Sequence, residues 1–324
     1  MVNIATLLGV PGLDAHLARL EETLKGSVAS GDPFLSEVAG HLIGAGGKRI
    51  RPALALAAAV AGGAEPSDDV LHGGVSVELV HIGSLYHDDV MDEALTRRGV
   101  ESVNARWGNL VAILAGDFLL ARASEIAASL GTEVAGLLAA TIGRLCEGQV
   151  GELKTAFSPT RTEDEYLRSI AGKTASLTAA SCRIGGLCAG LDRPAVEALT
   201  VFGEAFGMVF QIRDDVLDVV GTDAQLGKPA GQDLVEGTYS LPVIRALADP
   251  VAGPELRALL GRPLDEAERD KAREIVRATS GVDEAMAVAR RYADDAASAL
   301  GALPGDTAAA LAGIGHRLLE DLTG

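Results

Sequence analysis

The sequence is poor in cysteine, in aromatic residues and in positive charge. Three cysteines in 324 residues give no disulfide framework and indicate a reducing compartment, with the cytoplasm as the expected location. Only 28 Lys and Arg stand against 45 Asp and Glu, a formal charge of −17, which argues against nucleic acid as the main ligand. No apolar run reaches the roughly 18 residues of a membrane span, and the N-terminus has no basic signal-peptide region. We therefore expect a soluble protein.

The remaining composition favours a globular all-α fold. Apolar residues make up 48% of the chain and aromatic residues only 3%. Apolar positions recur every three or four residues in the segments 75–85, 110–128 and 196–220, whereas alternating strand-like runs are missing. Several of these helices are apolar all round, which indicates that other helices surround them. No linker or repeat interrupts the chain, so residues 1–324 are predicted to form a single helical domain.

Two clusters with the same spacing carry the strongest chemical signal. They are Asp88, Asp89 and Asp92, and then Asp214, Asp215 and Asp218. Offsets of zero, one and four residues place three carboxylates within about 100° of one helix face. One such cluster could be a solvated acidic face, but the second is flanked by apolar residues, which a solvated face would not be. All-oxygen ligands suit Mg²⁺, so two facing clusters predict a polymetal site for a phosphate-rich ligand.

Isolated cations supply the complement to these acids. They are Lys48 and Arg51 in the motif GGKRIRP, Arg97 and Arg98 after the first aspartate cluster, Lys173, and Lys228. The glycine-flanked motif alone is weak evidence, because Lys and Arg near a helix start are usually surface charge. His81 lies two helical turns before Asp88; a lone histidine is more often a core residue, but this one is expected to point into the same cavity. Together the cations predict one diphosphate bound through metal and a second bound directly.

The motifs GGKRIRP, LYHDDVMDEALTRRG, AGKTA, FQIRDDVLDVVG and LGKPAGQDLVEG, in this order, resemble the head-to-tail trans-polyprenyl diphosphate synthase family. The resemblance spans roughly residues 35–247, and the segment after Pro250 matches only as generic helix. It implies an isoprenoid-synthase fold of about a dozen helices round a central cavity, a homodimer, and Mg²⁺. The implied reaction joins isopentenyl diphosphate to an allylic diphosphate: the allylic diphosphate ionises, the isopentenyl double bond attacks the cation, and a proton leaves to the departed diphosphate.

The resemblance also implies roles for individual residues. The six aspartates would bind the metals on the allylic diphosphate, and Arg97, Lys173 and Lys228 would assist them. Isopentenyl diphosphate would be bound by Lys48, Arg51, His81 and Arg98. Gln211 is placed near the reacting carbons and Thr174 near the carbocation. One position departs from the family, because Thr238 stands where many members have lysine, so a phosphate contact there is either absent or supplied by water.

The residues before the first aspartate cluster predict the product length. Gly83 and Ser84 are small where short-chain members carry an aromatic residue, and Val80 and Val77 continue the same side of the helix. Tyr86 points about 200° away from Asp88 and is expected in packing. An open tunnel predicts a product longer than geranylgeranyl, serving as a quinone side chain, with a peripheral membrane contact for its release. A blocking residue from another helix would instead give a geranylgeranyl or farnesyl diphosphate synthase.

Three other interpretations account for part of the sequence. A non-catalytic partner subunit of a heteromeric synthase would share the fold, but it has no reason to keep six aspartates. A terpene cyclase would carry one aspartate-rich motif and an Asn/Ser/Glu triad on the second helix, whereas this chain repeats the first motif. A structural bundle with chance acidic clusters does not explain why the cations and acids occur together.

Overall fold

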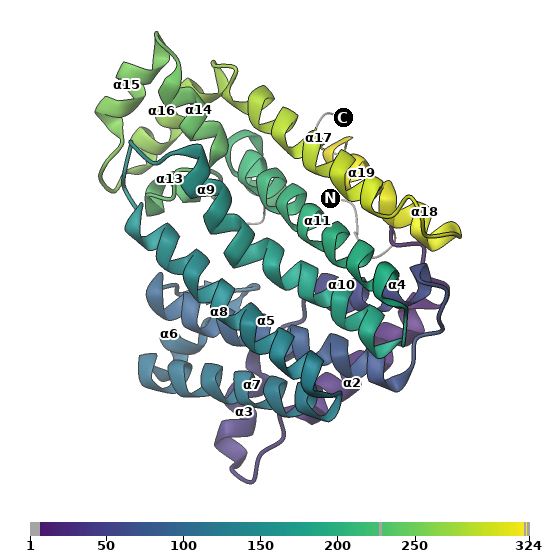
Figure 1. Cartoon of the computed structure of the whole chain (residues 1–324). Helices are drawn as coiled ribbons and strands as arrows, with labels where there is room; N and C mark the ends of the chain where they lie inside the picture. Colours follow the sequence, from purple (N-terminus) through teal and green to yellow (C-terminus); the bar gives the residue numbers. More distant parts are fainter. Residues whose placement is uncertain (1–6, 227–228, 321, 323–324) are drawn as a thin grey trace.

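The computed structural model of the chain describes residues 7–226, 229–320 and 322, and helices make up most of them (Figure 1). The first half contains α2 (Leu13–Ser27), α3 (Pro33–Gly44), α4 (Ile50–Ala61), α5 (Asp68–Met91), α6 (Val103–Trp107), α7 (Asn109–Ser129) and α8 (Thr132–Lys154). The middle contains α9 (Glu163–Ile170), the π-helix η1 (Ala171–Ala175), α10 (Ser176–Cys188) and α11 (Arg193–Val220). The all-α prediction is confirmed.

The last third is also helical. It contains α12 (Asp223–Leu226), α13 (Gln232–Glu236), α14 (Leu241–Ala248), α15 (Ala252–Leu259), α16 (Glu266–Arg277), α17 (Gly281–Ala299), α18 (Asp306–Ala312) and α19 (Ile314–Glu320). The helices outnumber the expected dozen because several are short, such as α12 and α13. That residues 1–324 form a single domain stays a prediction.

Side-chain caps set where the two motif-bearing helices begin. Ser67 accepts a hydrogen bond from the Val70 N–H at the start of α5. Asp192 accepts one from the Ala195 N–H at the start of α11, where Pro194 occupies the first turn. Such caps satisfy donors that a helix start leaves open, and proline needs no donor there. The register of each helix, and so the direction of its aspartates, is anchored well before the motif.

The two motif-bearing helices lie in the middle of the molecule (Figure 1). α10 packs against α4, α5 and α11, while α5 also packs against α7, and α11 against α17. Most of α4 is buried, since its alanines let neighbours approach closely. α11 is long and apolar enough to cross a membrane, but 56% of its most apolar window is buried inside the protein. The expectation of apolar helices surrounded by other helices is confirmed.

Two local features were not expected from the sequence. Strands β1 (Thr96–Arg97) and β2 (Val100–Glu101) pair antiparallel, with Thr96 opposite Glu101. Their turn has φ of 54° at Arg98 and 77° at Gly99, and two consecutive left-handed residues are what a tight hairpin requires. The second feature is the π-helix η1, which interrupts the helix that would join α9 to α10. Both features carry basic residues of the motifs, and π-helical turns are frequent at functional sites.

Candidate active site

A cavity between α5, α8, η1 and α11 measures about 630 Å³. Sites for small ligands are typically about 300–1,000 Å³ in volume. Nine of the residues singled out from the sequence line it: Arg51, His81, Ser84, Asp88, Arg97, Lys173, Thr174, Gln211 and Asp214. His81, Ser84 and Asp88 recur at helical spacing along α5, as the sequence predicts. The opposite wall is apolar and includes Leu145, Val150 and Leu153 of α8. One cavity is thus lined by charged side chains and by an apolar wall from α8.

The first aspartate cluster is divided by the structure. Asp88 lines the cavity of about 630 Å³, and Asp92 lines a smaller adjoining one of about 190 Å³. Asp89 is fully buried, and its Oδ1 accepts hydrogen bonds from Arg97 Nε at 2.7 Å and Nη2 at 2.5 Å. Burial raises the pKa of Asp88; Lys173 opposes this and the Asp92 charge adds to it. The expected convergence of three carboxylates thus applies to Asp88 and Asp92, while Asp89 is turned towards Arg97.

The second cluster is divided into one exposed carboxylate and two buried ones. The Asp214 side chain is 46% exposed and lines the larger cavity. Asp215 is buried, and its two oxygens accept hydrogen bonds from the Tyr166 hydroxyl at 2.6 Å and Gln211 Nε2 at 2.8 Å. Burial raises the Asp215 pKa to about 7, although both hydrogen bonds oppose the shift. Asp218 is buried as well, and one of its oxygens accepts the Asp233 N–H at 3.2 Å.

The π-helix directs two neighbouring side chains into the site. Lys173 Nζ donates to Glu152 of α8 at 2.6 Å, and the Thr174 hydroxyl donates to Gln211 Oε1 at 2.7 Å. Burial disfavours the charged ammonium, but Glu152 and Asp88 outweigh it and raise the pKa of Lys173. Gln211 is held at both ends of its amide, since its nitrogen donates to Asp215. Its carbonyl oxygen is therefore fixed beside the cavity.

The exposed acids suit a hard divalent cation. They offer only carboxylate oxygens, and burial raises the pKa values of Asp88 and Asp92, so a bound cation would stabilise their charged forms. Within the described residues, no three His, Cys, Asp or Glu side chains already surround a single metal position.

The second group of basic residues meets the same cavity from the start of α4 and from α5. Arg51 and His81 line it, and within the described part of the chain Arg51 Nε has no hydrogen-bond partner although it is buried. Burial, together with the charges of Arg51 and Arg98, lowers the pKa of His81 well below its usual value, so its imidazole is neutral. Lys48 is exposed on the loop before α4. Arg98 Nη1 donates to the carbonyl oxygens of Leu42 and Gly46 in that region.

Three further residues were singled out from the sequence: Lys228, Thr238 and Tyr86. Lys228 lies outside the described residues. Thr238 lines the smaller cavity, where a cation is nevertheless present: Arg161 is buried there, donates Nη1 to the Tyr239 carbonyl, and has no partner for Nε or Nη2 among the described residues. Tyr86 is buried in packing, as expected, and its hydroxyl donates to the Val38 carbonyl at 2.7 Å.

The residues assigned to product length differ in position. Ser84 lines the cavity, whereas Gly83 faces α7: a Cβ there would stand 3.1 Å from the Gly116 carbonyl oxygen and 3.4 Å from Leu119. Val80 and Val77 are fully buried in the core shared with α7. Of the residues expected along the tunnel, Ser84 lines this cavity. The expectation for Gly83 was wrong, because Gly83 packs against α7.

Several site residues were missed by sequence reasoning. Glu152 pairs with Lys173, Tyr166 binds Asp215, and Glu78 pairs with Arg49. Glu78 could have been found, because it is the only Asp, Glu, Lys or Arg between Asp69 and Asp88 and lies three residues before His81. Tyr166 is 49 residues from its partner and has no local signal.

Comparison with known proteins matches the polyprenyl synthetase family model over residues 32–279. The chain is 43% identical to heptaprenyl diphosphate synthase component 2 of Geobacillus stearothermophilus, covering 90% of this chain and 91% of that one. It is 38% identical to the nonaprenyl diphosphate synthase of Mycobacterium tuberculosis, covering 94% and 91%. A polyprenyl synthase from Caulobacter crescentus, solved with calcium and isoprenyl diphosphate, superposes with a TM-score of 0.90 at 33% identity and 97% coverage of both chains.

Proposed function

The chain belongs to the polyprenyl synthetase family, and we propose that it condenses isopentenyl diphosphate with an allylic diphosphate to make a long-chain all-trans polyprenyl diphosphate. One observation carries this proposal: acids from α5 and α11 and cations from three other segments face one cavity that also has an apolar wall from α8. Heptaprenyl and nonaprenyl synthases among the relatives support a product longer than geranylgeranyl. Its use as a quinone side chain stays a prediction.

The allylic diphosphate is assigned to the acidic side of the cavity. Asp88, Asp92 and Asp214 would hold Mg²⁺, which supplies charge neutralisation of the diphosphate as the allylic carbon–oxygen bond breaks. Arg97 and Lys173 line the same side and add fixed positive charge for the leaving group. The buried carboxylates have a different task, because Asp89 holds Arg97 and Asp215 holds Gln211.

Isopentenyl diphosphate is assigned to the basic residues Arg51, at the start of α4, and His81 of α5. Arg51 has an unused donor, and neutral His81 can donate one N–H without adding charge. The isopentenyl double bond then attacks the allylic cation, and the proton that leaves goes to the departed diphosphate. Gln211 and Thr174 present oxygen atoms beside the reacting carbons. The apolar wall from α8 keeps out water, which would quench the cation.

The test is a product assay with purified protein, Mg²⁺, labelled isopentenyl diphosphate and allylic primers of several lengths. We expect chains longer than C20 after hydrolysis, and no product when the metal is chelated. Product that stops at C15 or C20 would refute the long-chain proposal alone. Absence of any condensation with every primer would refute the proposed function.

Exposed apolar residues on one face support a homodimer. Leu110 is 79% exposed, Leu114 65% and Ile113 41%, and all three lie on one stripe of α7. A contiguous apolar face of this kind is typical of an interface. We propose that a second copy covers it, and light scattering should then give twice the mass of the chain, falling to the monomer for Leu114→Lys. The name of the Geobacillus relative, "component 2", makes a different subunit the competing outcome.

A reducing location is also part of the proposal. The cysteines are free in the described structure, and burial raises the pKa of Cys182 to about 12, so its thiol is unreactive. The expected cytoplasmic location rests on this cysteine usage.

A further inference from the structure

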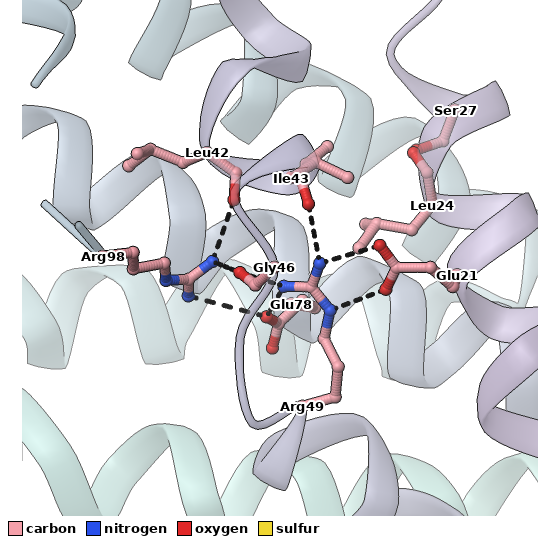
Figure 2. A network of polar contacts seen from close by, with 9 residues as sticks. All are labelled: Glu21, Leu24, Ser27, Leu42, Ile43, Gly46, Arg49, Glu78 and Arg98. Atoms are coloured by element: carbon pink, nitrogen blue, oxygen red, sulfur yellow. Dashed lines mark hydrogen bonds and ion pairs between the residues drawn. The ribbon is translucent and has the colours of Figure 1, made fainter. Parts of the chain in front are cut away.

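Three guanidinium groups interact with one buried carboxylate, that of Glu78. Arg49 and Arg98 lie beside it (Figure 2), and Arg51 interacts with it electrostatically. Glu78 lies in α5 and is only 2% exposed. It does not line the cavity of about 630 Å³, although it stands one turn before His81, which does. A buried carboxylate is costly unless it is paired, so its place behind the diphosphate-binding cations needs an explanation.

Arg49 is the closest of the three and is fully engaged by protein groups. Its Nη1 donates to Glu78 at 2.9 Å, and its Nε and Nη2 donate to the two oxygens of Glu21 at 2.8 and 3.0 Å. Nη2 also donates to the Ile43 carbonyl at 3.1 Å (Figure 2). Arg49 thus joins α2, the end of α3 and α5, and it does not serve as a diphosphate ligand although it stands within GGKRIRP.

Arg98 approaches the same carboxylate from the hairpin. Its Nη2 lies 4.0 Å from Glu78 Oε1, while Nη1 donates to the carbonyls of Leu42 and Gly46. Gly47 lies between the two guanidiniums with φ of 153°, and a Cβ there would stand 3.0 Å from Arg49 Nη1 and from Arg98 Nη1. The loop before α4 is therefore held between two arginines that one carboxylate attracts.

Arg51 is the third cation, and it is the one that reaches the cavity. Burial lowers its pKa, and the Glu78 charge opposes that shift. Burial raises the pKa of Glu78, and the charges of Arg49, Arg51 and Arg98 all oppose that shift. The negative charge of Glu78 and the positive charges of the arginines thus stabilise one another in the protein interior. Without the carboxylate, the three guanidiniums would repel one another.

We propose that Glu78 is a positioning residue for the second diphosphate: its carboxylate holds Arg49 and Arg98, and with them the segment from Gly46 to Arg51, in place before isopentenyl diphosphate binds. This inference rests on the proposed function, which assigns that substrate to Arg51 and its neighbours. Preorganised cations bind an anion more tightly because less ordering accompanies binding. The substrate would then meet donors that are already converged.

The Glu78→Gln variant separates positioning from simple charge. Glutamine has nearly the same shape and can still accept the Arg49 hydrogen bond, but it carries no charge. If Glu78 affected binding only as a negative charge near an anion, its neutralisation would tighten binding. Positioning predicts the opposite, because the guanidiniums separate. A charge-assisted contact is roughly twice as strong as a neutral one, so we expect the dissociation constant of isopentenyl diphosphate to rise about tenfold.

Binding should be measured by calorimetry with isopentenyl diphosphate alone, without primer or metal, so that no turnover occurs. Steady-state assays should then show a raised KM for isopentenyl diphosphate and a KM for the allylic substrate within about twofold of the original. Equal changes in both Michaelis constants, or unchanged or tighter binding of isopentenyl diphosphate, would overturn the inference.

Two further variants control for stability. Glu133→Gln removes a glutamate that also engages two arginines, Arg193 and Arg183, but on the surface at the start of α8. It should leave both Michaelis constants unchanged. The double variant Arg49→Met with Glu78→Met replaces a buried pair by apolar side chains, which often preserves stability. It should fold and bind isopentenyl diphosphate at least as weakly as Glu78→Gln; binding like the unmodified protein would contradict the proposal.

The inference and the proposed function fail in different ways. Absence of condensation by the unmodified protein with every primer refutes the function. Condensation by the unmodified protein, together with unaltered isopentenyl diphosphate binding in Glu78→Gln, refutes the positioning role alone.

Discussion

Replacing Ser84 with phenylalanine should shorten the product. Ser84 lies four residues, about 6 Å along α5, from Asp88, on the wall of the cavity. Its hydroxyl donates only to the His81 carbonyl of its own helix, at 2.8 Å. A phenylalanine buries about 150–250 Å² of surface. Placed opposite Leu145 and Cys146 of α8, the ring would close the apolar end of a cavity of about 630 Å³.

The metal site should survive this change because Asp88 is a full turn away. We expect farnesyl or geranylgeranyl diphosphate in place of longer chains, with the first condensation still occurring. The assay extends labelled isopentenyl diphosphate from a short primer and sizes the hydrolysed products. Ser84→Ala is the matched control, because it removes the hydroxyl without adding bulk, and its product length should not change.

Gly83→Phe tests the same reasoning from the neighbouring position. Its side chain would meet the Gly116 carbonyl oxygen and Leu119 of α7 and not the cavity. Overpacking of this kind costs about 1–3 kcal/mol, so we expect a lower unfolding temperature. An unchanged product spectrum in Ser84→Phe, or a shortened product in a fully stable Gly83→Phe, would show that the chain follows another path.

Three other outcomes are expected. Asp88→Ala should lower turnover at least about a hundredfold without destabilising the fold, because burial already disfavours its charge; near-normal turnover or a large drop in unfolding temperature would contradict this. Arg51→Ala should raise the KM for isopentenyl diphosphate about tenfold while Lys173→Ala acts mainly on the allylic substrate, and equal effects on both substrates would refute the assignment of sites. A hydrogen bond from Arg262 lowers the pKa of Glu268 to about 2 from its usual 4.5. The stabilisation from this pair is therefore present above pH 4.5 and is lost as the pH falls towards 2. Urea unfolding should show a smaller loss of stability on acidification for Glu268→Gln than for the unmodified protein, and identical pH profiles would contradict this.

Sequence periodicity was sufficient to predict which residues of α5 line the cavity. His81, Ser84 and Asp88 line one cavity because three- and four-residue steps return to the same side of a helix. The same rule placed Tyr86 in packing, where its hydroxyl is bonded to α3. These predictions needed only helix geometry, and long apolar helices express that geometry reliably.

Contacts between distant segments could not be predicted in this way. The pair formed by Tyr166 and Asp215 joins α9 to α11, and the pair formed by Arg49 and Glu78 joins the start of α4 to α5. Each depends on how helices cross, which periodicity does not specify. The tight hairpin that carries Arg98 was also missed, because two-residue strands leave no alternating pattern.

The division within each aspartate motif shows why an identical spacing does not imply identical roles. Adjacent helical residues point about 100° apart, so the second aspartate of each motif is turned away from the first and into the protein. There Asp89 binds Arg97, and Asp215 binds Gln211, and both of these partners line the cavity. The second carboxylate of each motif therefore fixes a cavity-lining side chain, while the first carboxylate lines the cavity itself. A repeated acidic motif thus supplies both ligands for a cation and supports for the groups that surround the substrate.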